Sequence, residues 1–134
     1  MNFNQLQSQE ERLDRMGKLS SDFSTRATEI DEAGSFPFEN INDLVKSGYT
    51  SLTIPTKWGG KGITLLDLIQ LQEKIAEGDG ATSLSIGWHM GIIKNLGEKE
   101  VWEESVYRKL CAAVQKGSLI NSAATEPRTG SPTR

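Results

Sequence analysis

Residues 81–96 of this chain, ATSLSIGWHMGIIKNL, are the stretch that decides its fold. When the stretch is drawn as a helix, its large apolar side chains point in almost every direction. A helix that is apolar all round is covered by neighbours on every side. The stretch therefore predicts a helix at the centre of a bundle. Neighbouring helices can approach it closely at its small residues, which are Ala81, Ser83, Ser85, Gly87 and Gly91.

The segments on either side predict the surrounding helices. Residues 4–33 repeat apolar residues at intervals of three, four or seven, which predicts one long helix with an apolar stripe. Gly17 weakens the middle of this segment, so two shorter helices are the alternative. Thr64 and Asp67 have the spacing of a capping box at the start of a helix. Gly97 is interpreted as the end of the central helix. The remaining helices are predicted over residues 37–47, 65–77 and 98–115.

Two short segments favour strands instead. Residues 49–55, YTSLTIP, have a β-favouring composition that a proline closes, and residues 118–124, SLINSAA, precede a turn-rich tail. The predicted fold class is mainly α, a bundle of about five to six helices with one short strand and the first strand and turn of a truncated β-domain. The helical domain is predicted over residues 1–117 and the second unit over 118–134. An isolated strand leaves its backbone unpaired, so the chain is interpreted as a fragment.

Composition excludes several classes of protein. The chain has 134 residues, with 15 Lys and Arg against 18 Asp and Glu, so it has no broad basic field for nucleic acid. One cysteine and one histidine cannot build a cysteine- or histidine-rich metal site. The longest uncharged run, residues 80–93, is too short and too polar to span a membrane, and the chain does not start like a signal peptide. A cytoplasmic location is therefore expected.

Few side chains are candidates for chemistry. His89 is the only one that titrates naturally near neutral pH, and it lies between Trp88 and Met90. It is either a core histidine held by a hydrogen bond, or a cavity wall or proton donor to a bound ligand. Cys111 is interpreted as a buried structural thiol. The loop WGGKG, residues 58–62, lacks the full phosphate-binding signature and is interpreted as a chain reversal.

Four motifs together resemble the amino-terminal part of the acyl-CoA dehydrogenase family. Two are long, FPFENINDLVKSGYTSLTIPTKWGGKGI (36–63) and LLDLIQLQEKIAEGDGATSLSIGWHMG (65–91). The others are LGEKE (96–100) and ATEPRTGS (124–131), which resembles the TEPxxGS turn at the flavin site of the family. From its chemistry alone, such a turn can direct backbone N–H groups and hydroxyls at an anionic or polar ring ligand.

The resemblance implies a fold and an activity. In the family, this helical region packs beside a central β-domain and a second helical domain, with FAD between them and an acyl-CoA stacked against the flavin. A glutamate base removes the α-proton, and the β-hydride passes to the flavin. The resemblance therefore implies FAD, an acyl-CoA substrate and a homotetramer. The catalytic glutamate would lie beyond residue 134, so this chain alone is expected to be inactive.

The resemblance also assigns site residues. The cofactor-binding residues that it implies are the backbone of Ala124 and Thr125 at the isoalloxazine ring, and Ser131 near the pyrophosphate and the thioester. The residues implied to line the acyl cavity are Ser85, Trp88 and His89.

Two other functions are compatible with the sequence. Flavin-dependent monooxygenases of the same fold can place a histidine in the corresponding helix, and His89 is compatible with that chemistry. The chain is alternatively a stand-alone helical module that docks a partner without catalysis.

Overall fold

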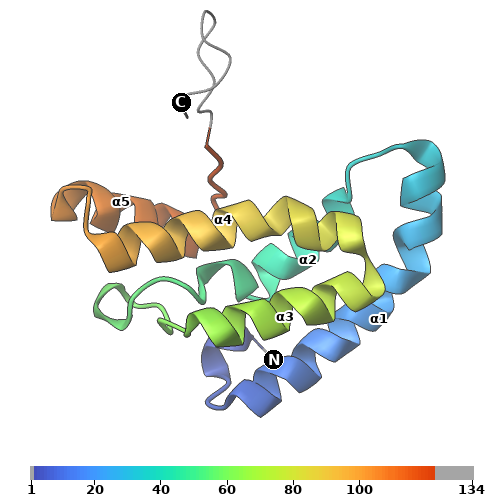
Figure 1. The fold of residues 1–134 in the computed structure, drawn as a ribbon, viewed down its shortest axis with the longest axis horizontal. Coiled ribbons are helices and arrows are strands. Elements are labelled where there is room, and N and C mark those ends of the chain that lie inside the picture. The colour runs from blue at the N-terminus through green and yellow to red at the C-terminus, as the bar shows by residue number, and fades with distance from the viewer. Residues whose placement is uncertain (1, 123–134) are drawn as a thin grey trace, which may run out of the picture.

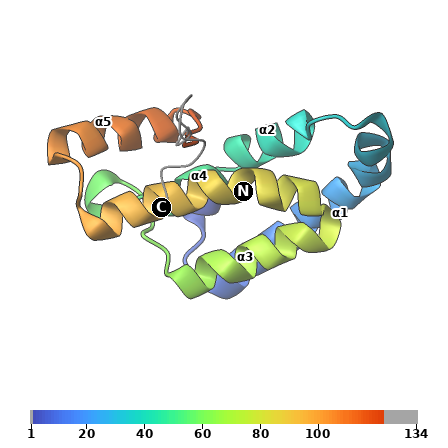
Figure 2. The same ribbon diagram turned by 45° about the horizontal axis from the view of Figure 1, so that its top comes forward.

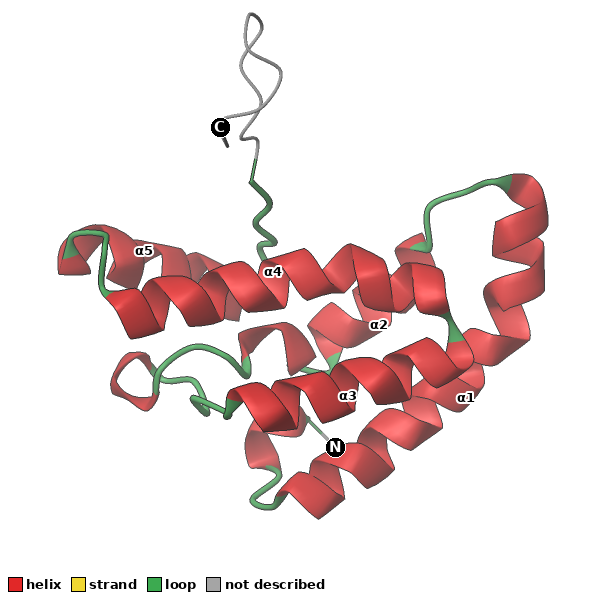
Figure 3. Ribbon diagram, viewed as in Figure 1, coloured by secondary structure: helices red, strands yellow, loops and turns green. Residues whose placement is uncertain are grey.

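The computed structural model describes residues 2–122, which form a bundle of helices (Figure 1). Every regular element within these residues is helical, and none is a strand (Figure 3). The mainly α fold class is thus confirmed. Short 3-10 helices occur at Phe3–Gln5, Tyr49–Ser51 and Thr56–Trp58. The α-helices are α1 (Gln9–Ala33), α2 (Phe38–Lys46), α3 (Leu65–Gly78), α4 (Gly80–Lys99) and α5 (Glu104–Gln115).

Helix α4 occupies the middle of the arrangement. Helix α3 packs along α1, and a tight turn after α3 leads into α4 (Figure 1). When the molecule is turned, α4 lies between α3 on one side and α2 and α5 on the other (Figure 2). The prediction of a central helix is therefore correct in position. One face of α4 is nevertheless left uncovered by residues 2–122, and that face positions the site described below.

Side chains cap the starts of the main helices. The Ser8 hydroxyl accepts the Glu11 N–H at the start of α1, and the Glu11 carboxylate accepts the Ser8 N–H at 2.9 Å. Thr64 and Asp67 form the same reciprocal pair before α3, which confirms the predicted capping box. Asp79 begins α4 by accepting the backbone N–H of Thr82 at 3.0 Å. These caps satisfy N–H groups that the first turn of a helix leaves without partners.

Two apolar clusters form the core. The larger joins the amino-terminal segment, α1, α2, α3 and the first half of α4. The smaller packs the second half of α4 against α5 and includes Ile93, Tyr107 and Cys111. Cys111 is buried as predicted, and burial raises the pKa of its thiol. Gly78 lets α3 meet α1, because a Cβ at this position would collide with the carbonyl oxygen of Ser20.

The predicted strand at residues 49–55 is wrong. Its backbone turns back on itself instead, with Leu52 N–H donating to Tyr49 O at 3.0 Å and Ile54 N–H donating to Ser51 O at 3.2 Å. The described part of the chain offers no second strand, so local bonds satisfy backbone groups that an extended segment would leave unpaired. The turns also bury the apolar side chains of the segment. Residues 118–122 likewise form no strand, and residues 123–124 lie outside the described range.

Some predicted helix boundaries also differ from the structure. Helix α1 is unbroken from Gln9 to Ala33, so the alternative of two shorter helices is wrong. Helix α4 continues through Gly97 to Lys99, and the chain reverses at Glu100, whose φ is 48°. Gly97 is needed for packing instead, because a Cβ there would lie 2.6 Å from the Tyr107 hydroxyl. The last helix therefore begins at Glu104, later than predicted.

None of the helices within residues 2–122 has the length and apolar character required to cross a bilayer.

Candidate functional site: an apolar groove on α4

One face of α4 carries large apolar side chains that nothing in the described chain covers. Leu84 is 73% exposed and Trp88 is 63% exposed. They lie four residues apart and therefore share one face of the helix. Contiguous exposed apolar surface of this kind marks a binding or interaction site more often than an isolated exposed side chain does. The prediction that α4 is covered all round is wrong for this face.

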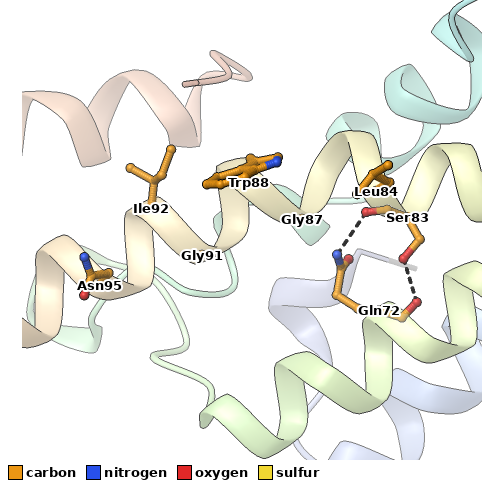
Figure 4. Close-up of a pocket in the computed structure, with 8 residues that line it drawn as sticks. All are labelled: Gln72, Ser83, Leu84, Gly87, Trp88, Gly91, Ile92 and Asn95. Carbon is orange, nitrogen blue, oxygen red and sulfur yellow. Dashed lines mark hydrogen bonds between the residues drawn. The ribbon is translucent and has the colours of Figure 1, made fainter. Parts of the chain in front are cut away.

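A groove of about 580 Å³ runs along this face (Figure 4). Leu84, Trp88 and Ile92 project from the same side of α4, and Gln72 extends toward α4 from α3 (Figure 4). Binding sites for small molecules commonly have volumes of roughly 300–1,000 Å³ and mostly apolar walls. The residues that line this α4 groove are Gln72, Ser83, Leu84, Gly87, Trp88, Gly91, Ile92 and Asn95.

Hydrogen bonds hold the polar edge of the groove in place. Gln72 Nε2 donates to the carbonyl of Ser83 at 3.1 Å, and the Ser83 hydroxyl donates to the carbonyl of Gln72 at 2.9 Å. The other atom of the Gln72 amide, Oε1, accepts the hydroxyl of buried Tyr49 at 2.8 Å. Burial raises the pKa of Tyr49, which keeps this hydroxyl protonated as a donor. The α3 side of the groove is therefore formed before any ligand binds.

Glycine at position 87 keeps the groove open beside this amide. A Cβ at Gly87 would lie 2.8 Å from Gln72 Nε2, closer than such atoms normally approach. Gly91, one turn further along, has no such neighbour within 4 Å. The two glycines line the same groove, but a Cβ would meet a close neighbour at Gly87 alone. Alanine at Gly91 is therefore a control for alanine at Gly87.

The part of the chain that the structure describes contributes no acid or base to the groove. Among its lining residues none is Asp, Glu, His, Lys, Arg, Cys or Tyr. No group of three or more potential metal-ligating side chains occurs within the described residues either. The α4 groove can therefore hold an apolar or flat ligand and exclude water from it, whereas proton transfer would need a group from outside the groove.

His89 lies on the inner side of α4 and is 2% exposed. Its Nε2 is 2.9 Å from the carbonyl oxygen of Thr50, and its Nδ1 accepts the backbone N–H of Ile120 at 3.1 Å. A backbone N–H only donates, so Nδ1 has no proton and Nε2 carries the proton donated to Thr50. Burial lowers the pKa of His89, against the opposing effect of the Thr50 hydrogen bond. The imidazole is thus neutral, and both its nitrogens are engaged.

The predicted site residues occupy different places. Trp88 lines the α4 groove, whereas Ser85 and His89 are not among the lining residues within the described chain. The Ser85 hydroxyl is exposed and donates to the carbonyl of Ala81 at 2.7 Å. The three residues predicted to bind the cofactor lie outside the described range, and they are Ala124, Thr125 and Ser131.

Sequence reasoning overlooked Gln72. It lies within the helix predicted over residues 65–77, and none of the motifs assigns it to a site. Its position does carry a signal, because it follows Leu68 by four residues and precedes Ile75 by three, both of which are buried. A polar residue at a core-facing position needs a hydrogen-bond partner, and such a residue is a candidate for a site at the edge of the core.

A family model and several known proteins match this chain. The sequence model described as "Acyl-CoA dehydrogenase, N-terminal domain" matches residues 8–110. The chain is 46% identical, over 98% of its length, to YdbM of Bacillus subtilis (strain 168), a protein assigned as an acyl-CoA dehydrogenase. It is 29% identical over 84% of its length to the mitochondrial isovaleryl-CoA dehydrogenase of Pongo abelii. It is also 29% identical over 80% of its length to the L-evernosamine nitrososynthase of a Micromonospora species.

The chain spans only part of these relatives. The alignments cover 35% of the Bacillus protein and 27% of each of the other two. The chain thus spans about a third of the length of these relatives.

Proposed function

This chain belongs to the acyl-CoA dehydrogenase family, whose amino-terminal domain it matches, and we propose that it forms that domain of a flavin-dependent enzyme oxidising acyl-CoA thioesters. In this proposal the enzyme removes one hydrogen from each of the α- and β-carbons of the acyl group. Bound FAD would supply the hydride acceptor. The base that takes the α-proton would come from another part of the enzyme, in accord with a groove to which residues 2–122 contribute no titratable side chain.

The observation that carries this proposal is the uncovered apolar face of α4. The groove has the size and apolar character of a small-molecule site, and its polar edge is already fixed by Gln72 and Ser83. Trp88 and Leu84 offer surface on which a flat ring or an acyl chain can pack, and both would exclude water from the reacting carbons. The residues present thus fit an apolar acyl chain beside a planar cofactor.

The cofactor contacts themselves remain predictions. Ala124, Thr125 and Ser131 follow the described residues in the sequence, within the ATEPRTGS motif. We assign them to the flavin ring and the pyrophosphate because of the motif alone. A homotetramer and a cytoplasmic location are likewise proposals that rest on the family resemblance and the composition.

The state of His89 bears on the alternative monooxygenase chemistry. A histidine that assists oxygen chemistry must present a ring nitrogen to the flavin or its ligand. Both ring nitrogens of His89 are instead engaged by backbone groups, and its side chain is not among the groove-lining residues of the described chain. This arrangement favours the dehydrogenase over a monooxygenase that relies on His89. The similarity to full enzymes speaks against a stand-alone docking module.

The proposal can be tested by flavin content. We expect the longer polypeptide that contains this chain to purify as a yellow protein with about one FAD per subunit. Residues 1–134 purified in the same buffer should be colourless, because they would supply only part of the cofactor site. A longer polypeptide that retains no flavin after reconstitution with FAD would contradict the proposal. Stoichiometric FAD on residues 1–134 would contradict the predicted division of the site.

A further inference from the structure

His89 joins three separate parts of the chain through one buried ring. It belongs to α4, its Nε2 donates to the carbonyl of Thr50 in the turn after α2, and its Nδ1 accepts from Ile120 after α5. The two partners lie 39 and 31 residues away from it in the sequence. A single neutral imidazole is suited to this role, because it offers one donor and one acceptor on opposite sides of a rigid ring.

The hydrogen bond to His89 holds the segment after α5 against α4. Helix α5 closes with local bonds, the last of which joins Ser118 N–H to Ala113 O at 3.1 Å. Within the described residues 119–122, the Ile120 N–H donates to His89 of α4. The Ser122 N–H donates locally, to the side chain of Asn121. Ile120 itself also packs against the smaller apolar cluster. The direction in which the chain leaves α5 is therefore set at Ile120.

We propose that His89 is a positioning residue, whose neutral Nε2–H tautomer fixes the point where the chain leaves the helical domain. The motif ATEPRTGS begins four residues after Ile120. If the proposed function holds, on which this second step rests, the anchor at Ile120 links His89 along the chain to the cofactor-binding motif. His89 would then affect flavin binding through Ile120, without touching the flavin.

Two substitutions each remove one of the two hydrogen bonds of His89 and keep the other. In H89N, the Asn side-chain oxygen takes the place of Nδ1 and accepts from Ile120, whereas the bond to Thr50 is lost. In H89Q, the longer side chain places its NH₂ group at the position of Nε2 and donates to Thr50, whereas the bond from Ile120 is lost. Each variant removes one hydrogen bond and the titrating ring, so that their general effects on stability are matched. Any difference between them reports on which bond was lost.

The first test measures amide hydrogen exchange in residues 1–134 by NMR. We expect the Ile120 amide to exchange about fivefold faster, or more, in H89Q than in H89N, because a typical hydrogen bond has a net effect of that size. The ¹⁵N shifts of His89 should show a protonated Nε2 and an unprotonated Nδ1. Equal exchange of Ile120 in the two variants, or a proton on Nδ1, would overturn the proposal. Thermal unfolding of both variants identifies any loss that is merely global.

The second test measures FAD affinity in the longer polypeptide. We expect H89Q to lower FAD affinity about fivefold more than H89N, in step with the exchange of Ile120. Equal FAD affinity of the two variants, when Ile120 exchange differs, would overturn the link between the anchor and the cofactor-binding turn. If the unmodified longer polypeptide bound no FAD, the proposed function would fail, while the exchange result would still decide the role of His89 at Ile120.

Discussion

Gln72 of α3 and Ser83 of α4 exchange two hydrogen bonds, in which each side chain donates to the backbone carbonyl of the other residue (Figure 4). This reciprocal pair joins the two helices at the edge of the α4 groove. Gln72 Oε1 also accepts the Tyr49 hydroxyl, so both ends of the amide are held by hydrogen bonds. A buried tyrosine that is not among the lining residues thus supports the groove through Gln72.

Replacing Gln72 should destabilise the helical domain. The variant Q72L removes both side-chain hydrogen bonds of Gln72 and leaves the buried Tyr49 hydroxyl without an acceptor. We expect a loss of about 1–3 kcal/mol in the free energy of unfolding, measured by urea denaturation. The control is E73A on the exposed neighbouring position. If Q72L were no less stable than E73A, the support that we assign to this amide would be wrong.

The two glycines of the groove should respond differently to alanine. At Gly91 a Cβ meets nothing within 4 Å, so G91A should stabilise α4 by about 0.5–1 kcal/mol through helix propensity alone. At Gly87 the new Cβ would press on Gln72 Nε2, so G87A should gain less stability or lose some. Thermal unfolding compares the two directly. Equal stabilisation by both substitutions would mean that Gln72 moves away freely.

The stability of the domain should fall below neutral pH because of His89. Burial lowers its pKa in the folded state, so the unfolded chain takes up a proton that the folded chain excludes. Stability contributed by the neutral ring is thus complete above the unfolded pKa, about 6.5. It is lost as the pH falls from there toward the lower folded pKa, with a slope of at most about 1.4 kcal/mol per pH unit.

This pH effect can be isolated because the chain contains one histidine. We expect urea midpoints of the unmodified chain to decrease between pH 7 and pH 5, and those of H89Q to be flatter over the same range. Parallel curves for the two proteins would show that groups other than His89 cause the decrease.

Replacing Asp79 should destabilise the domain more than replacing an exposed carboxylate does. Asp79 is buried, accepts the N–H groups of Ala81 and Thr82 at the start of α4, and contacts the Asn40 amide of α2 at 3.4 Å. The variant D79A removes the cap and leaves buried donors without partners, so it should cost about 1–3 kcal/mol. Chemical denaturation beside D14A, an exposed carboxylate of α1, provides the comparison. Similar losses in the two variants would contradict the role of the cap.

Local signals in the sequence predicted local structure well. The capping pair Thr64 and Asp67 was predictable because both partners lie within one helical turn. The strand predicted at residues 49–55 was wrong because a β-favouring composition suits buried turns as well as strands when no second strand is near. Gly97 was misinterpreted as a helix end because its partners, Tyr107 and Pro55, are distant in sequence.

The site was only partly predictable for the same reason. The sequence placed Trp88 on α4, but its exposure depends on which faces α2, α3 and α5 leave free. The partners of His89 are backbone groups far along the chain, and no pattern of residue types reveals them. Gln72 carried a detectable signal as a polar residue on an apolar stripe, whereas the direction of its amide required the positions of Tyr49 and Ser83.

The most direct test of the central claim is an anaerobic titration of the flavin-containing longer polypeptide with acyl-CoA thioesters. We expect saturable loss of flavin absorbance, with W88A weakening acyl-CoA binding about tenfold, in line with the loss of a large aromatic contact. The matched control is W102A, which removes a 43% exposed tryptophan outside the α4 groove and should titrate like the unmodified protein. Flavin that no acyl-CoA bleaches, or equal effects of W88A and W102A, would contradict the account.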